Sequence, residues 1–420
     1  MLEVALPRMA LVRQRFPETA EPDIEAAVGE GIAALGIRSG ARIAVGVGSR
    51  GITNLPRAVA ATVRSLKEAG ARPFLIPAMG SHGGATPEGQ RGVLEEYGVT
   101  EESCGAPVRP SLETRVLGTT DDGVPVHCSV EALESDGVLV VNRVKPHTDF
   151  QGTLGSGMIK MVVIGLGKQA GASACHRASS RLGHERVLRS VFRILARKAP
   201  VLGGVGLVED ARHRTARVEL VPVSELEARE AVLLEDARRR MARLPFERID
   251  LLVVDRIGKD VSGAGMDPNV TGRTVHGYSS RLSDPAPLVR RILVRDLTPA
   301  SHGNAIGVGT ADFTTTRLVE KIDRGSTYMN ALTALSVQSI KVPPHFDTDR
   351  EAVSQAVASL ALADPASARV LRIRDTLTLE TLEASQALAE EARDRKDLEL
   401  VREPASWKFD STGHLLPIGA

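Results

Sequence analysis

Short apolar runs rich in β-branched residues alternate with helical stretches along the chain, and this alternation constrains the fold more than any other feature. In the first half, the runs cover 42–48, 72–80 and 136–144, and a helical segment comes after each of the first two. Strands that alternate with helices of about 10–15 residues are typical of βαβ units, in which strands pair in parallel. The sequence therefore predicts an α/β fold with mainly parallel sheets.

A polar segment rich in helix-forming residues, 224–244, interrupts this alternation, which then restarts. The apolar runs of the second half are 248–258, 288–297, 304–310, 369–377 and 398–402. A length of 420 residues suggests two or three domains at roughly 150 residues each. We predict two α/β domains, residues 1–245 and 246–420, with the active site in the cleft between them.

Charge and composition exclude several classes of function. Lys and Arg number 53 against 52 Asp and Glu, and aromatic residues are 3% of the chain, so neither a basic nucleic-acid footprint nor a set of stacking platforms is expected. The three cysteines have no C-x-x-C spacing, which argues against a disulfide framework or a structural zinc site. No apolar run reaches the ~18 residues of a membrane span, and charges interrupt the N-terminal segment. The expectation is a cytoplasmic protein without nucleic-acid or membrane partners.

Three polar loops follow the first three predicted strands. They contain Ser49-Arg50-Gly51, Ser81-His82-Gly83-Gly84 and Lys145-Pro146-His147. In open parallel sheets, ligands bind beyond the carboxyl ends of the strands. The three loops together therefore predict a binding site at one edge of the first sheet.

Each of the two loop histidines has a chemical and a structural interpretation. His82 is followed by two glycines, which allow a tight turn and a close approach of a ligand. His147 follows a proline, with Asp149 near enough in sequence to orient the ring. An imidazole at such a position can act as an acid or base near neutral pH. The alternative for both is an exposed or turn-capping loop histidine.

Two lysines compete for a role as a nucleophile or covalent tether. Lys160 stands between Ile159 and Met161, before a Val-Val-Ile run, and loss of hydration there would lower its pKa. The alternative is a lysine at the end of an element whose ammonium group reaches water. Lys168 follows a glycine, a position more typical of the end of a phosphate-binding loop.

Further polar residues could bind a metal or an anion. His176 is interpreted either as a core histidine or, with Cys175, as a soft metal pair, because imidazole suits nickel, zinc or copper. In the glycine-rich segment 257–273, Lys259 and Arg273 could neutralise a carboxylate or phosphate.

The order of these motifs resembles the lactate racemase family and, more broadly, the isomerases that depend on a nickel-pincer cofactor. The motifs are G-S-H-G-G-A-T-P-E-G, then V-K-P-H-T-D-F, then Lys160, then His176, and the likeness extends into G-A-G-M-D-P-N-V-T-G-R and A-D-F-T-T-T-R-L-V-E-K-I-D. Any one motif is weak, but their order is specific. The resemblance covers nearly the whole chain.

The resemblance implies an enzyme that racemises or epimerises a small 2-hydroxy acid. It assigns His82 and His147 as the two acid/base groups, and it assigns Lys160 as the thioamide attachment of the nickel-pincer nucleotide (the pyridinium-3-thioamide-5-thiocarboxylic acid mononucleotide). His176 becomes the protein ligand to nickel, and Lys259 a lysine near the substrate. The resemblance also implies a mechanism in which a histidine takes the proton of the substrate hydroxyl while the α-hydrogen leaves as hydride to the pyridinium ring of the cofactor.

This sequence departs from lactate racemase in the segment before Lys160, which is longer and reads T-L-G-S-G, and in the loop after the first strand. That loop reads S-R-G-I-T-N, where Arg50 is the nearest match to the family's substrate arginine, and Ser49, Arg50 and Gly51 are predicted to contact the cofactor or substrate. Two alternatives remain. One is a zinc-dependent lyase or hydrolase that uses His82, His147 and His176, and the other is a cofactor-binding protein without turnover.

Overall fold

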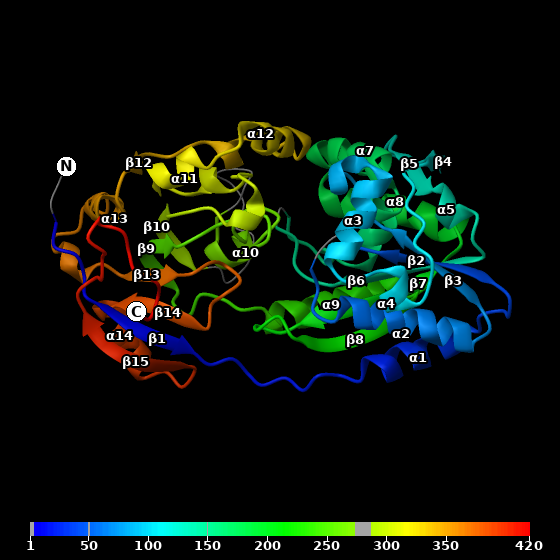
Figure 1. The fold of residues 1–420 in the computed structure, drawn as a ribbon, viewed down its shortest axis with the longest axis horizontal. Coiled ribbons are helices and arrows are strands. Elements are labelled where there is room, and N and C mark those ends of the chain that lie inside the picture. Colours follow the sequence, from blue (N-terminus) through cyan, green and yellow to red (C-terminus); the bar gives the residue numbers. More distant parts are fainter. Residues whose placement is uncertain (1–3, 49–50, 149, 274–286) are drawn as a thin grey trace. The chain divides into compact units, whose positions relative to one another are not determined.

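The structure is a computed structural model, and it describes residues 4–48, 51–148, 150–273 and 287–420. The chain divides into two compact units, one formed by Glu18–Met241 and the other by Met1–Pro17 together with Ala242–Ala420. Figure 1 shows both units with their elements labelled. The predicted division at 245 lies close to the observed one at 241, but residues 1–17 belong with the C-terminal unit.

The unit of residues 18–241 contains a five-stranded sheet of order β3-β2-β6-β7-β8. Strands β3, β2, β6 and β7 pair in parallel, and β8 pairs antiparallel to β7. The predicted mainly parallel α/β architecture is confirmed here. The sheet strands are β2 (Arg42–Val47), β3 (Arg72–Pro77), β6 (Gly137–Arg143), β7 (Val201–Glu209) and β8 (Thr215–Pro222), and a separate hairpin is formed by β4 (Thr114–Thr119) and β5 (Pro125–Ser129).

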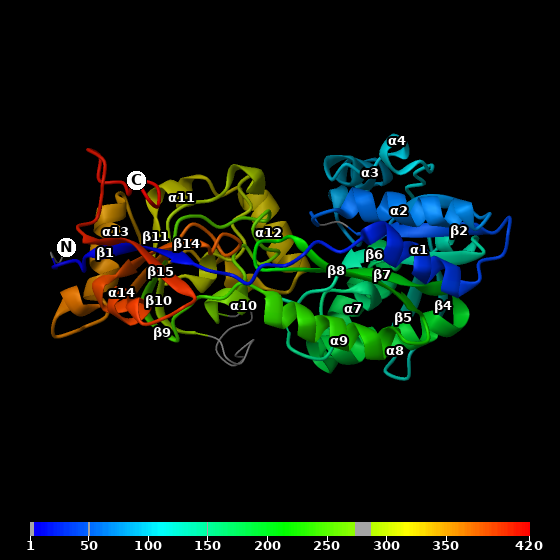
Figure 2. The ribbon, with the colours of Figure 1, turned by 90° about the horizontal axis from the view of Figure 1, so that it is seen from below.

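Helices cover both faces of this sheet, and side chains alternate between two apolar cores. One core joins Ile43, Val45 and Leu75 to α1 (Ile24–Leu35) and α2 (Leu55–Glu68). The other joins the opposite face to α6 (Met158–Lys160), η2 (Met161–Gly165), α7 (Lys168–Leu182), α8 (His184–Lys198) and α9 (Leu226–Arg240). Figure 2 shows α1 and α2 on one side and α8 and α9 on the other. The short helices are η1 (Gly83–Ala85), α3 (Pro87–Glu96), α4 (Glu101–Cys104) and α5 (Val130–Leu133).

Local sequence signals explain where these helices begin and end. In α1, the Asp23 side chain accepts a hydrogen bond from Ala26 N, and Gly36 ends the helix with φ 61°, as N-caps and left-handed C-caps do. In α8, Val187, Leu188, Val191, Phe192 and Leu195 are buried, which is the spacing of one helical face. That face packs into the second core.

The other unit has a mixed six-stranded sheet of order β10-β9-β13-β14-β1-β15. Only β10, β9 and β13 pair in parallel, whereas β13–β14, β14–β1 and β1–β15 are antiparallel. This differs from the mainly parallel sheet expected. The strands are β1 (Met9–Gln14), β9 (Arg248–Val254), β10 (Leu288–Val294), β13 (Val370–Ile373), β14 (Thr381–Ser385) and β15 (Leu398–Ala405), and β11 (Thr314–Thr315) pairs with β12 (His345–Phe346).

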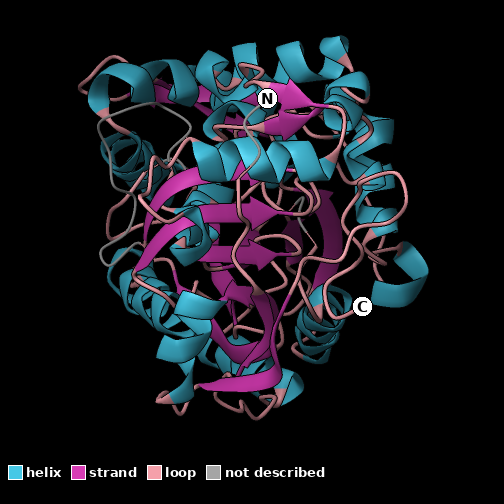
Figure 3. Cartoon of the chain, turned by 90° about the vertical axis from the view of Figure 1, so that its left-hand side faces the viewer, coloured by secondary structure: helices cyan, strands magenta, loops and turns pink. Residues whose placement is uncertain are grey.

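Helix α13 (Asp349–Ala358) packs its buried face against Leu251, Val253 and Leu293 of this sheet, and Figure 3 shows the strands and helices of the chain coloured by type. The helical segments here are α10 (Pro268–Thr271), η3 (Pro299–Ser301), η4 (Val308–Thr310), α11 (Thr316–Glu320), α12 (Arg324–Thr333), η5 (Val337–Ile340), α13 (Asp349–Ala358), η6 (Pro365–Ser367) and α14 (Gln386–Arg393). Within the described residues, no helix is both long and apolar enough to cross a membrane.

The strand predicted at 304–310 is wrong, because this segment forms turns and η4. Gly307 has φ 98°, and a Cβ on Gly309 would lie 2.1 Å from the carbonyl oxygen of Gln338. The glycines therefore let this loop pack against other backbone, and the apolar pattern reflects burial rather than a strand.

Candidate active site

The loops with the predicted site residues leave the carboxyl edge of one parallel sheet. His82 follows β3 and His147 follows β6, and both strands are direct neighbours of β2. Two inter-strand spacings amount to about 10 Å, a width suited to a small ligand. Of the predicted loop after β2, Gly51 is exposed, and Ser49 and Arg50 lie outside the described residues.

The structure brings His147 and Lys160 into direct contact. The Lys160 Nζ and His147 Nε2 atoms lie 3.0 Å apart. Backbone hydrogen bonds between Lys145 and Ser156 in both directions, 3.0 and 2.8 Å, close the loop that separates them. The Asn142 side chain also donates to the Gly157 carbonyl at 3.3 Å. These bonds return the chain to the end of β6 and place the amine beside the imidazole.

The glycines of T-L-G-S-G are required by this return. A Cβ on Gly155 would lie 2.5 Å from the Lys145 carbonyl oxygen, and one on Gly157 would lie 2.4 Å from the Glu230 carboxylate. Glu230 is fully buried on α9 and accepts a hydrogen bond from Ile159 N at 2.8 Å. Burial raises the pKa of this carboxyl to about 7. The longer segment before Lys160 is therefore a close-packed turn anchored from α9.

His147 stands in a group of rings and cations. Its ring stacks on Phe150 with centroids 4.4 Å apart, and Phe150 stacks on His184 at 4.9 Å. Burial lowers the pKa of His147 well below its usual value, and nearby Lys160, His184, Lys145 and His176 lower it further through their charge. His147 is therefore neutral at physiological pH and can accept a proton. The predicted partner Asp149 lies outside the described residues.

His176 lies on α7 and is close enough to act on the pKa of His147. Its sequence neighbour Cys175 points into the apolar core, where burial raises the thiol pKa to about 12. Successive helix positions differ by roughly 100° in direction, so the side chains of Cys175 and His176 diverge. The geometry therefore favours His176 as a single imidazole over the Cys175–His176 metal pair.

Lys160 and Lys168, the two competing lysines, have different environments. Lys160 is partly exposed beside His147, whereas Lys168 is 1% exposed and donates its Nζ hydrogen to the Pro77 carbonyl. Burial lowers the pKa of Lys168 to about 8. Lys168 is therefore a buried hydrogen-bond donor and not the end of a phosphate-binding loop, and Lys160 is the lysine that a ligand at this edge could reach.

His82 is partly buried at the start of η1, and its carbonyl accepts a hydrogen bond from Ala85 N at 3.2 Å. Gly83 has φ 61°, and a Cβ there would lie 2.3 Å from the backbone of Gly89. The Gly-Gly pair after His82 therefore serves a tight turn against α3. The structure places His82 at the predicted sheet edge, and its pairing with His147 across one substrate stays a prediction.

Several residues of this edge were not predicted. Glu209, at the end of β7, forms an ion pair with Arg143 and accepts a hydrogen bond from Thr53 N at 2.9 Å. It thereby holds the loop after β2. The acidic pair Glu209-Asp210 directly after an apolar strand was the available signal. His184 and Phe150 had no such signal, because nothing local marks their stacking on His147.

The predicted residues of the second half belong to the other unit. Lys259 donates to the Gly263 carbonyl at 2.8 Å, closing the loop after β9. Arg273 forms an ion pair with Asp312 at 2.8 Å, so its charge is balanced within the protein. A position of Lys259 near the substrate stays a prediction.

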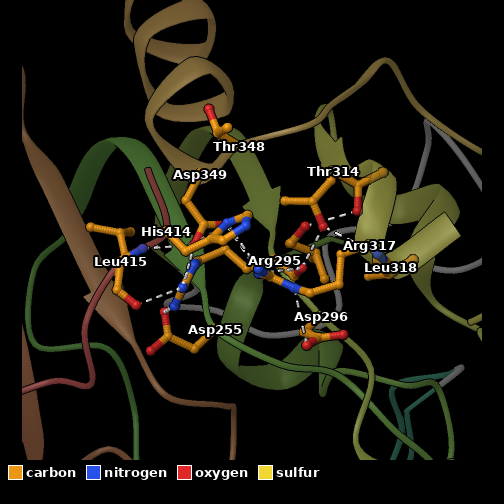
Figure 4. A network of polar contacts seen from close by, with 12 residues as sticks. Asp255, Arg295, Asp296, Thr314, Arg317, Leu318, Thr348, Asp349, His414 and Leu415 are labelled. Carbon is orange, nitrogen blue, oxygen red and sulfur yellow. Dashed lines mark hydrogen bonds and ion pairs between the residues drawn. The ribbon is translucent and has the colours of Figure 1, made fainter. Parts of the chain in front are cut away.

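A buried ion-pair network occupies the carboxyl ends of β9 and β10 in this unit (Figure 4). Arg295 donates to Asp255 at 2.6 Å and also to Asp349. The side chain of Asp349 is 0% exposed. Its carboxylate forms an ion pair with Arg317 at 3.1 Å and accepts a hydrogen bond from Leu415 N at 2.8 Å. The charges of Arg295, Asp255 and Asp349 are balanced inside the protein, which makes this a structural network rather than a ligand site.

Comparisons with known proteins bear on the first unit most directly. A family model described as the lactate racemase N-terminal domain matches residues 38–186, a range that contains His82, His147, Lys160 and His176. A solved lactate racemase apoprotein from Thermoanaerobacterium thermosaccharolyticum shares the fold, with a TM-score of 0.54 and 15% identity over 88% of this chain and 99% of the other. Residues 38–186 are therefore similar to the N-terminal domain of lactate racemase.

A second similar structure is that of a protein from Thermotoga maritima, with a TM-score of 0.51 and 11% identity over 78% of this chain and 85% of the other. At these identities the two structures show a shared fold. No curated protein matches the chain significantly. The predicted resemblance is confirmed for the fold and for the N-terminal domain that the family model matches.

Proposed function

We propose that this chain is a racemase or epimerase of a small 2-hydroxy acid that depends on a nickel-pincer nucleotide. The observation that carries the proposal is the 3.0 Å approach of Lys160 Nζ to His147 Nε2 inside the segment that matches the lactate racemase N-terminal domain. A lysine amine that can be modified then lies beside a neutral imidazole that can take a proton.

The side chains fit this group better than a zinc site held by protein ligands. Zinc sites usually gather three or four protein ligands, and the described residues contain no group of three His, Cys, Asp or Glu side chains placed to hold a metal. Lys160 would hold the nucleotide, and the imidazole of His176 would be the protein's ligand to nickel. When bound, the cofactor supplies a hydride acceptor, which no side chain can provide.

The protein's own groups would bind the substrate and move its hydroxyl proton. His147, neutral because of its burial and its cationic neighbours, accepts the proton from a substrate hydroxyl on its side of the pocket. His82, on the loop after β3, whose strand lies two positions from β6 in the sheet, does the same on the other side, so either configuration at C2 meets a base. A cation fixes the carboxylate, and Lys145, one of the charges that act on His147, is the best-placed described residue.

Stereoinversion by the cofactor-loaded protein tests this proposal. We expect turnover of at least one small 2-hydroxy acid, followed by chiral chromatography, and a loss of at least about 100-fold in His82→Ala and in His147→Ala. Arg177→Ala, an exposed change on α7, is the control and should keep full activity. Full activity in both histidine variants would contradict the assignment, and cofactor binding without any turnover would favour the carrier alternative.

A further inference from the structure

The segment that carries His82 leaves the sheet through a narrow passage. After β3, Ala78 N still donates to the Val47 carbonyl at 2.7 Å, and the chain then runs between η2 and α7. A Cβ on Gly165 would lie 2.8 Å from the Ala78 carbonyl oxygen, and one on Gly80 would lie 3.0 Å from Ala172 Cβ. The backbone of 78–80 is therefore packed directly against the first turn of the helix that bears His176.

Lys168 reaches into this passage from α7. Its Nζ donates to the Pro77 carbonyl, the side chain is 1% exposed, and its backbone has φ 53°. A left-handed φ is unfavourable for a residue with a Cβ, and so is the burial of an ammonium group. Lys168 combines both at the position where its amine donates to the last carbonyl of β3.

Gln90 holds the same segment from the other side. It is fully buried on α3, and its Nε2 donates to the Gly80 carbonyl at 3.0 Å and to the Met79 carbonyl at 3.4 Å. Three carbonyls within four residues, those of Pro77, Met79 and Gly80, thus receive side-chain donors from two different helices. The segment has left the ladder of the sheet, and these donors replace its strand partners.

We propose that Lys168 and Gln90 are positioning residues that fix His82 relative to the helix of His176. The inference rests on the proposed function, in which His82 transfers a proton. The carbonyls that the two donors hold end two residues before His82, and the donors belong to α7 and α3, which both contact the segment of 77–80. Because Lys168 is the first residue of α7, a shift of that helix would move the Pro77 carbonyl and, through the chain, His82. A displacement of about 1 Å can lower turnover by about 100-fold.

Lys168→Met removes the amine with little change in shape, and Gln90→Leu removes the amide independently. Gln14→Leu is the matched control, because Gln14 is also a buried amide that donates to a carbonyl, that of Arg243 at 3.2 Å, but outside this segment. Hydrogen–deuterium exchange of the amides of 78–82 and the rate of His82 carbethoxylation, read by mass spectrometry, require neither substrate nor cofactor.

In Lys168→Met and in Gln90→Leu we expect the rates of amide exchange in 78–82 and of His82 carbethoxylation to rise roughly tenfold. We also expect kcat to fall at least about tenfold and KM to stay unchanged. The control should lower the melting temperature without these effects. Unchanged exchange and modification in both variants would overturn the inference; if Lys168→Met does not fold, Gln90→Leu decides alone. His82→Asn separates the two proposals, because full activity in that variant would refute the proposed function, not the positioning.

Discussion

His147 is kept neutral by neighbours of several kinds acting in the same direction. Burial removes water from the ring, and the charges of Lys160, His184, Lys145 and His176 disfavour a further proton. Conversion of the Lys160 amine to a neutral thioamide would remove one of these charges. The pKa of His147 would then rise from its lowered value, although burial would still depress it. The proposed attachment at Lys160 would therefore also make His147 a stronger base.

Glu230 gives a prediction about stability and pH. Its pKa is raised to about 7 from a usual 4.5, so the folded state favours the protonated form. Its contribution to stability is therefore greatest below pH 4.5 and is lost as the pH rises through 7, by about 3 kcal/mol in all. Glu230→Gln removes this loss. From pH 5 to pH 8, urea unfolding should show the variant gaining stability relative to the native protein by most of that amount.

Glu235→Gln is the control for this prediction, because Glu235 lies on the same helix with a side chain 54% exposed. Its stability relative to the native protein should be the same at both pH values. A constant difference for Glu230→Gln as well would show that the Glu230 carboxyl is ionised throughout this range.

At the scale of the elements, the first turn of α3 packs against the turn at Gly83 so closely that only glycine fits at position 89. A Cβ on Gly89 would lie 1.9 Å from the Gly83 carbonyl oxygen, whereas one on Gly92 would meet nothing within 4 Å. Gly89→Ala should therefore push the His82 turn away and lower stability by at least about 2 kcal/mol. Gly92→Ala should raise stability by up to about 1 kcal/mol through helix propensity.

Thermal unfolding and stereoinversion assays of Gly89→Ala and Gly92→Ala measure these effects on stability and activity. Gly92→Ala should keep its activity, and Gly89→Ala should lose most of it. Equal stability and equal activity in the two variants would mean that the turn at Gly83 does not depend on this contact.

At this scale the sequence predicts those elements whose signals are local. The runs at 42–48, 72–80 and 136–144 became β2, β3 and β6, and because parallel strands share an edge, the placement of His82 and His147 followed. Lys168 could not be interpreted correctly, because its partner carbonyl on Pro77 is 91 positions away. Glu230, which anchors Ile159 across 71 positions, gave no local signal either. Contacts of such range depend on packing that no short motif describes.

At the scale of the whole molecule, one unit is formed by both ends of the chain, residues 1–17 and 242–420, and the residues between them form the other. Strand β1 lies between β14 and β15 and pairs with both, so the sheet of the second unit is incomplete without the first 17 residues. Sequence order alone assigned these residues to the first domain, since nothing in a strand of six residues identifies its partners.

Val12 and Arg13 of β1 test this arrangement. Val12 is fully buried and Arg13 is exposed. Val12→Asp should lower the stability of the unit of residues 1–17 and 242–420 by at least about 3 kcal/mol and leave the unit of 18–241 folded, whereas Arg13→Ala should change little. Proteolysis with peptide mapping identifies which unit opens. Cleavage confined to 18–241 in the Val12→Asp protein would contradict the observed division.

The central claim is that Lys160, beside His147, carries a nickel-bearing nucleotide, and peptide mass spectrometry with metal analysis of the protein from cofactor-producing cells tests it most directly. We predict a covalent mass increment on the Lys160 peptide, none on the Lys168 peptide, and about one nickel per chain, lost in Lys160→Met. An unmodified Lys160 peptide together with stoichiometric zinc would contradict the claim.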